Sequence, residues 1–235
     1  MSTKFWLVVP AAGVGARMAA DRPKQYLQVG GRCIIEHTLD RFLDHPDLLG
    51  AVVCLAAADP YWPQLAVASD PRVRRAPGGR ERADSVLAGL DALQAAGAGE
   101  QDWVLVHDAA RPNLAREDLQ RLLAVLADDP VGGLLAVPVR DTLKRADADG
   151  RVAQTVNRSQ IWQAYTPQMF RLGALSQALR GALAAGVPIT DEASALEWCG
   201  QSSRLVEGRA DNLKITRPED LAWLRQAWVE RDRQR

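Results

Sequence analysis

The chain has 235 residues, 47% of them hydrophobic and 25% charged, so it can bury a full core and form one large domain. Its 29 Lys and Arg residues balance 29 Asp and Glu residues, so no overall field draws it to nucleic acid or to an anionic membrane. The apolar run near the N-terminus is too short for a secretory signal, no window reaches the ~20 apolar residues of a membrane span, and three scattered cysteines indicate reduced thiols, which together predict a cytoplasmic protein.

Strands and helices are predicted to alternate along the first half of the chain. Short apolar runs predict strands at 5–9, 51–56, 103–106 and 134–137, and helical patterns are found at 34–43, 83–93 and 119–126. Strands that are apolar along their whole length indicate a parallel sheet covered by helices on both faces. We therefore expect an α/β fold, Rossmann-like, with a mostly parallel twisted sheet whose ligands bind at the carboxyl ends of the strands.

The segment after the fourth strand interrupts this alternation. Two polar runs, 142–145 and 152–156, flank Asp149-Gly150, a pair that favours a hairpin turn. A polar two-stranded ribbon has no core of its own, so it must pack on the domain or on another subunit. We expect a single domain over 1–235 that carries a β-arm at 140–165. Beyond it, helices are predicted at 172–185, at 192–198 and from Pro218 onward, with a strand at 203–206.

The loop after the first strand predicts a polyphosphate site. It reads Pro10-Ala11-Ala12-Gly13-Val14-Gly15-Ala16-Arg17-Met18 and is followed by Pro23-Lys24-Gln25. Small residues let backbone amides approach phosphate oxygens, and Arg17 and Lys24 supply cations for a triphosphate. The plainer alternative is a tight turn with two solvated cations. The loop lacks the third glycine of a dinucleotide fingerprint, and Pro23-Lys24-Gln25 is no Walker A sequence.

An acidic residue, Asp108, follows the third predicted strand directly, in Val106-His107-Asp108-Ala109-Ala110-Arg111-Pro112. A carboxylate at the end of a core strand is a natural ligand for Mg²⁺, which also takes substrate phosphate oxygens. The alternative is that Asp108 only caps the following turn. We expect His107 to be structural, because a lone histidine at a strand end is more often a hydrogen-bonded neighbour than a catalytic group.

Three later segments carry weaker signals. In the turn before the second helix, Arg82 and Ser85 share one helical face near Gly79 and could contact a base, although Ser85 or Asp84 could equally be a helix cap. Cations and hydroxyls occur together at 155–158 and 208–216, where a second phosphorylated substrate or plain solvent could lie. Thr190-Asp191-Glu192 reads first as a helix start.

Taken in order, these motifs resemble the 2-C-methyl-D-erythritol 4-phosphate cytidylyltransferase family along almost the whole chain. The first loop indicates only the wider nucleotidyltransferase superfamily, whereas the string at 106–112 and Thr190-Asp191-Glu192-Ala193 are specific to this branch. The resemblance implies transfer of the cytidylyl group of CTP to 2-C-methyl-D-erythritol 4-phosphate, release of pyrophosphate, a requirement for Mg²⁺, and a homodimer.

The resemblance also implies roles for individual residues. Arg17 and Lys24 would stabilise the triphosphate, Arg158 and Lys214 would grip and aim the second substrate, and Asp108, with Asp211 as a further ligand, would hold the metal. The CTP pocket would be lined by Pro10, Ala11, Ala12, Gly13, Gly15, Gly79, Arg82, Ser85 and Ala109. The second substrate would contact Arg111, Thr142, Arg158, Thr190, Asp191 and Lys214, with the arm completing the site of a neighbouring subunit. Arg80 stands where an acid is common in the family.

Three other functions are weighed against this one. A ribitol 5-phosphate cytidylyltransferase would share the first loop and the sheet and differ only in the residues of the second site. A nicotinamide-dependent oxidoreductase is disfavoured by the missing third glycine. A catalytically silent nucleotide-binding protein would leave the complete set of charged residues Arg17, Lys24, Asp108, Arg158 and Lys214 unexplained.

Overall fold

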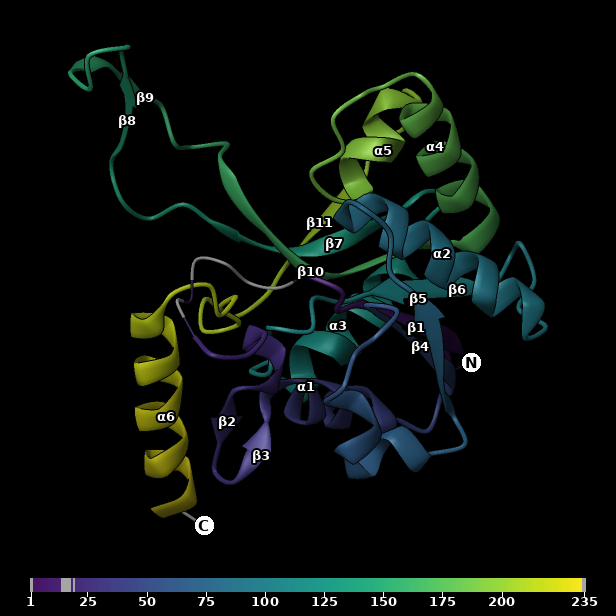
Figure 1. Ribbon diagram of the computed structural model, residues 1–235. Helices are drawn as coiled ribbons and strands as arrows, with labels where there is room; N and C mark the ends of the chain where they lie inside the picture. The colour runs from purple at the N-terminus through teal and green to yellow at the C-terminus, as the bar shows by residue number, and fades with distance from the viewer. Residues whose placement is uncertain (1, 14–17, 19, 234–235) are drawn as a thin grey trace.

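The described residues form a seven-stranded sheet at the centre of the molecule (Figure 1). The computed structural model describes residues 2–13, 18 and 20–233. Among these, neighbouring strands of the sheet run parallel except where β10 pairs with β6 and β7, so the expected mostly parallel α/β sheet is confirmed. In spatial order the strands are β11 (Arg204–Glu207), β7 (Gly132–Pro138), β10 (Trp162–Arg171), β6 (Trp103–Val106), β1 (Phe5–Pro10), β4 (Leu48–Leu55) and β5 (Val73–Pro77).

Helices cover both faces of this sheet, as its apolar strands predict (Figure 1). One face packs against α1 (Ile34–Leu43), α3 (Arg116–Leu126) and two short 3-10 turns, η3 (Trp62–Gln64) and η4 (Ala66–Ser69), and the other against α2 (Arg82–Ala95), α4 (Leu172–Ala184) and α5 (Glu192–Trp198). Successive residues of a strand point to opposite faces, so Leu7 and Val9 enter the first core and Val8 the second. Within the described residues, no helix is long and apolar enough to cross a membrane.

The β-arm is the tip of a long antiparallel hairpin. Strand β7 leads into it and β10 returns beside β7, with Trp162 opposite Pro138 and the amide of Val139 donating to the carbonyl of Ile161 at 3.0 Å. The arm itself holds the two-stranded ribbon of β8 (Leu143–Ala146) and β9 (Val152–Val156), which projects from the body of the molecule (Figure 1). The predicted hairpin is therefore present, and it leaves the sheet between two neighbouring strands.

A bulge in β10 shapes the sheet next to the site. Ala164 pairs with Ala136 and Gln168 with Leu134, so three residues of β10 lie opposite one residue of β7. Proline cannot donate to the strand ladder, and Pro167 lies inside this bulge. The extra residues push Tyr165 and Thr166 out of the regular pairing, toward the carboxyl end of β6.

The last helix, α6 (Pro218–Arg233), packs away from the main sheet. It lies beside a small hairpin of β2 (Gln28–Val29) and β3 (Arg32–Cys33), which follows the 3-10 turn η2 (Lys24–Tyr26) (Figure 1). Leu221 and Leu224 of α6 join a separate apolar cluster with Ile215 and Ala110. The cluster fixes the segment that enters α6 against the loop after β6.

Candidate active site

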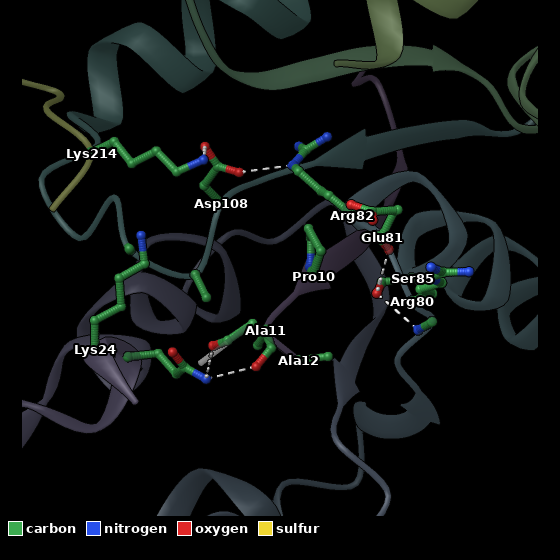
Figure 2. Close-up of a pocket in the computed structure, with 15 residues that line it drawn as sticks. Pro10, Ala11, Ala12, Lys24, Arg80, Glu81, Arg82, Ser85, Asp108 and Lys214 are labelled. Atoms are coloured by element: carbon green, nitrogen blue, oxygen red, sulfur yellow. Dashed lines mark hydrogen bonds and ion pairs between the residues drawn. The ribbon is translucent and has the colours of Figure 1, made fainter. Parts of the chain in front are cut away.

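Two cavities meet above the carboxyl ends of β1 and β6. The first has a volume of about 310 Å³ and lies between the first loop and the start of α2. The second has a volume of about 260 Å³ and lies between the bulge of β10 and the start of α5. Three charged side chains, Arg82, Asp108 and Lys214, line both cavities. In Figure 2, Lys214 and Arg82 extend toward Asp108 from opposite sides. We call this trio the shared wall.

Gln25 fixes the described part of the first loop. The amide of Ala11 donates to the carbonyl of Cys54 at 2.8 Å, which continues the pairing of β1 with β4. The buried Gln25 side chain donates from Nε2 to the carbonyl of Ala11 at 2.7 Å. The Pro23-Lys24-Gln25 motif is recognised in the sequence, but it predicts no role for Gln25, because a glutamine by itself does not indicate which backbone carbonyl its side chain will bind.

The turn before α2 packs directly on that loop. A Cβ added at Gly78 would lie 2.1 Å from the Cβ of Ala12, so only glycine allows the two loops to touch. The amide of Gly79 donates to Ser85 Oγ at 2.9 Å, and that hydroxyl donates to the carbonyl of Glu81 at 3.1 Å. Ser85 thus lines the cavity and shapes the glycine turn, whereas the N-cap of α2 is Glu81, whose amide donates to Asp84 Oδ2 at 2.9 Å.

Asp108 is the electrostatic centre of the site. Its carboxylate is 3.2 Å from Arg82 Nε, 3.2 Å from Arg111 Nε and 3.0 Å from Lys214 Nζ. Burial works to raise the pKa of this carboxyl, but the charges of Arg82, Lys214 and Arg111 outweigh burial and hold the pKa far below its usual value. Asp108 is therefore ionised, and each of its oxygens accepts from at least one cation.

Lys214 is held in place by its neighbours in the chain. The side chain of Asn212 donates to the carbonyl of Thr166 at 2.8 Å, and the carbonyl of Asn212 accepts from Arg111 Nη1 at 2.7 Å. The amide of Ile215 donates to the carbonyl of Ala110 at 2.8 Å. Asn212 and Ile215 are both buried, so the segment that contains them is fixed and holds Lys214 within reach of Asp108.

A fourth charged residue, Glu192, reaches the shared wall from α5. Its carboxylate accepts from Arg82 Nη1 at 2.6 Å and from Arg82 Nη2 at 3.1 Å, and the residue is 1% exposed. Glu192 and Asp108 together outweigh burial and raise the pKa of Arg82 above its usual value. From its sequence context Glu192 is predicted only as a first-turn acid of a helix, because nothing local in the sequence indicates that it will meet an arginine 110 positions away.

His107 is structural, as predicted. It is fully buried, its Nε2 bonds to the carbonyl of Arg111 at 3.0 Å, and its Nδ1 accepts from Thr166 Oγ1 at 3.0 Å. Because the carbonyl can only accept, the proton is on Nε2. Burial lowers the pKa of His107 to about 4, so the ring is neutral near pH 7. The Thr166 hydroxyl also accepts from the amide of Asp108 at 3.1 Å, which fixes the turn that carries Asp108.

The structure brings most of the predicted CTP residues together. Gly15 and Arg17 lie outside the described residues, so their predicted roles have no structural test. The first cavity is lined by the remaining predicted residues and by Lys24, namely Pro10, Ala11, Ala12, Gly13, Lys24, Gly79, Arg82, Ser85 and Ala109. Arg80 also lines this cavity, so the departure from the family pattern falls within the site.

The residues predicted for the second substrate fall into two groups. Arg111, Thr190, Asp191 and Lys214 line the second cavity, together with the unpredicted Tyr165, Thr166 and Gln168. Thr142 and Arg158 are exposed on the arm and line neither cavity of their own chain. Arg158 donates to the carbonyl of Arg140 at the base of the arm.

Asp108, the predicted metal ligand, lines both cavities. Among the residues described, no cluster of three or more His, Cys, Asp or Glu side chains could hold a metal. Mg²⁺ commonly takes one or two carboxylates and completes its shell with water and substrate phosphates, so Asp108 at the shared wall fits that chemistry. Asp211 pairs with Arg209 at 2.6 Å and lines neither cavity, which gives its predicted role as a second ligand no geometric support.

Comparison with known proteins agrees with this geometry. The family model described as IspD, 2-C-methyl-D-erythritol 4-phosphate cytidylyltransferase, matches residues 5–231. The chain belongs to this family. A cytidylyltransferase of that description from Ectopseudomonas mendocina (strain ymp) is 98% identical over the whole of both chains, and one from Pseudomonas putida (strain W619) is 72% identical over 97% of each.

Solved structures of cytidylyltransferases share the fold. A crystal structure of 4-diphosphocytidyl-2C-methyl-D-erythritol synthase superimposes with a TM-score of 0.82 at 39% identity, covering 96% of this chain and 99% of the other. The 2-C-methyl-D-erythritol 4-phosphate cytidylyltransferase of Francisella tularensis gives a TM-score of 0.81 at 33% identity, covering 95% and 99%. The resemblance inferred from motifs therefore extends to the whole fold.

Proposed function

We propose that this protein is a nucleotidyltransferase that transfers the cytidylyl group of CTP to 2-C-methyl-D-erythritol 4-phosphate and releases pyrophosphate. The family match and the identity of the curated relatives support this activity. The observation that carries it is the shared wall: two cavities of similar size meet at Arg82, Asp108 and Lys214, as a reaction between two bound phosphates requires.

The reaction is an in-line displacement at phosphorus. A phosphate oxygen of 2-C-methyl-D-erythritol 4-phosphate attacks the α-phosphorus of CTP, and the bond from that phosphorus to the bridging oxygen breaks as pyrophosphate leaves. The attacking phosphate is already an anion, so the protein needs no nucleophile or strong base of its own. Its task is to align two anions that repel each other and to neutralise the charge that develops between them.

The described residues divide this task between the two cavities. The glycine turn and the first loop would hold the nucleotide in the first cavity, with Lys24 beside its phosphates. Arg111, Thr190 and Asp191 would hold the second substrate. Lys214 and Arg82, which line both cavities, would lie nearest the reacting phosphorus and stabilise charge on either side of it.

Mg²⁺ is proposed as the cofactor, with Asp108 as its protein ligand. When bound, it would neutralise triphosphate charge and favour departure of pyrophosphate. Both carboxylate oxygens of Asp108 face cations in this structure, so a bound metal would compete with Lys214, Arg82 and Arg111 for them.

A homodimer with shared sites is proposed on the arm. Thr142 and Arg158 carry groups suited to a phosphorylated alcohol, yet in their own chain they lie outside both cavities. A polar ribbon that projects from the body gains stability by packing on a second subunit, where these residues would reach that subunit's second cavity. The cysteines fit the proposed cytoplasmic location, since Cys33, Cys54 and Cys199 are all free thiols.

Pyrophosphate release tests the proposed reaction. Each of CTP, UTP, ATP and GTP is paired with 2-C-methyl-D-erythritol 4-phosphate, and CTP is also paired with ribitol 5-phosphate, with and without Mg²⁺. We expect rapid release only with CTP, methylerythritol phosphate and Mg²⁺ together. Faster release with ribitol 5-phosphate would establish the alternative activity, which the curated relatives disfavour.

A further inference from the structure

A buried carboxylate in α5 engages the shared wall from outside both cavities. Glu192 is 1% exposed, lines neither cavity, and bonds to both terminal nitrogens of Arg82, whose Nε is 3.2 Å from Asp108. The guanidinium of Arg82 is thereby clamped between two carboxylates on two of its edges. The orientation of the Arg82 guanidinium is therefore set in part by its two hydrogen bonds to Glu192.

A role in starting α5 does not account for this carboxylate. Acids in the first turn of a helix are generally favourable, but the cap of α5 is already supplied by Asp191, whose Oδ1 accepts from the amide of Ser194 at 3.0 Å. An acid in the first turn can interact with the helix dipole while it is exposed, so this interaction does not explain why Glu192 is buried. Burying an ion pair removes two charges from water, and an apolar pair of similar volume is often as stable. The pair therefore calls for a functional explanation.

The backbone around Glu192 is fixed from β10. The side chain of Gln168 donates from Nε2 to Asp191 Oδ2 at 2.9 Å and accepts at Oε1 from the amide of Ala193 at 2.9 Å. The residues before and after Glu192 are thus tied to one buried side chain, that of Gln168, at the end of the bulge of β10. This anchoring fixes the orientation of the Glu192 carboxylate. A group that orients another side chain must itself be held in place.

We propose that Glu192 is a positioning residue for the transfer reaction, which holds the Arg82 guanidinium in the shared wall and prevents it from turning onto Asp108. Without the Glu192 carboxylate within reach of both terminal nitrogens, Arg82 would pair with Asp108 through two nitrogens. That pairing would compete with Lys214 for the Asp108 carboxylate. It would also reduce the space between the two cavities, where the two substrate phosphates would meet. The inference rests on the proposed function for its kinetic test, and on geometry alone for its structural test.

The kinetic test is a double-mutant cycle with E192Q and R82Q, measured as kcat for pyrophosphate release at saturating substrates. We expect E192Q to lower kcat by about tenfold or more in the wild-type background, but by less than about threefold when Arg82 is already glutamine. The matched control is E197Q, the same change at an exposed residue of α5, which should leave kcat unchanged. Equal losses in both backgrounds, or a kcat for E192Q close to wild type, would overturn the inference.

Folding is monitored in parallel by thermal unfolding of each variant. If E192Q does not fold, E192D carries the same cycle, because it keeps the charge but not the reach to both nitrogens of Arg82. A merely structural role would lower the melting temperature and reduce kcat alike with and without Arg82, whereas a positioning role predicts loss only where Arg82 is present.

A crystal structure of E192Q, or of E192D should E192Q not fold, separates this inference from the proposed function. We expect the Arg82 guanidinium to have left its place beside residue 192 and to pair with Asp108 through two nitrogens. An unmoved Arg82 would overturn the positioning role whatever the reaction proves to be. A wild-type protein that releases no pyrophosphate from CTP would instead overturn the proposed function, while a displaced Arg82 would still support the geometric role of Glu192.

Discussion

Lys24 lines the first cavity and lies on η2, the 3-10 turn that follows the first loop. Its Nζ donates to the carbonyl of Ile215 at 3.0 Å, which places the ammonium group beside the segment that presents Lys214. Two cations from distant parts of the chain thus border one cavity. A triphosphate bound there would meet the ammonium groups of Lys24 and Lys214 on the same side of the cavity (Figure 2).

Replacing Lys24 with alanine should lower kcat by about a thousandfold while folding is retained. A cation about 4 Å from developing charge contributes roughly 4 kcal/mol at an effective dielectric near 20, which corresponds to that rate factor. Steady-state kinetics with both substrates measures the loss, and K4A, which removes an exposed lysine near the N-terminus, is the control. A loss of less than about tenfold would remove Lys24 from the catalytic machinery.

His107 should make stability depend on pH. Its pKa is lowered to about 4 by burial from an ordinary value of 6.5, so in this interval the unfolded chain binds a proton that the folded chain does not. The stabilisation is therefore complete above pH 6.5 and is lost as the pH falls toward about 4. The linkage amounts to roughly 3 kcal/mol. Urea unfolding across this range should show a steeper decline for the wild type than for H107Q, and parallel curves would contradict the assignment.

Sequence predicted some of the site residues better than others, for a physical reason. Arg82 and Asp108 stand at strand or helix ends, where the polarity of a parallel sheet fixes which edge they share. Gln25, Gln168 and Glu192 act by holding other groups, and their partners are set by tertiary packing that no local pattern encodes. Glutamine and glutamate at such positions look like ordinary surface residues until the fold buries them.

At the scale of elements, the first loop and the turn before α2 form one unit because they touch at Ala12 and Gly78. The amide of Gly78 donates to the carbonyl of Leu55 at 2.7 Å, which extends the edge of the sheet into this contact. The first cavity is therefore bounded by two loops whose close approach depends on the absence of a side chain at Gly78.

Substituting alanine for Gly78 should force these loops apart. The added Cβ would lie 2.1 Å from that of Ala12, so we expect a loss of about 1–3 kcal/mol in the free energy of unfolding and weaker CTP binding. Removing the opposing methyl in the double variant A12G/G78A should restore most of the stability. Urea unfolding and titration with CTP measure the two effects. A G78A protein as stable as the wild type would show that the loops move freely.

The elements that sequence missed are those with mixed polarity. Strand β5 is an edge strand whose Arg74 and Arg75 are exposed, so it offers no apolar run. Strand β10 contains Gln163, Pro167 and Gln168, and its bulge breaks any regular alternation. The continuous apolar strands β1, β4, β6 and β7 are buried on both faces, which is why their pattern predicted them within a few residues.

At the scale of the whole molecule, the arm is an outgrowth of the sheet and not a separate unit. It leaves from β7 and returns through β10, the strand that carries Tyr165 and Thr166 in the second cavity. In the proposed dimer the arm of one chain would contact the second cavity of the other chain. Through β10, the same arm is also connected to the second cavity of its own chain.

Mixing two impaired variants tests this arrangement. R158A and K214A should each impair use of methylerythritol phosphate more than CTP binding. If Arg158 serves the partner's site, then mixed dimers contain one intact site, and random exchange of subunits should restore about a quarter of wild-type activity. The control is a mixture in which both proteins carry K214A, which should recover nothing. A mixture of R158A and K214A no more active than its components would place Arg158 in the site of its own chain.

The two cavities share a boundary at Arg82, Asp108 and Lys214, which line both of them. An inhibitor that links a cytosine analogue to a polyol through an anionic tether would thus place its linker beside Arg82 and Lys214, the cations that border both cavities.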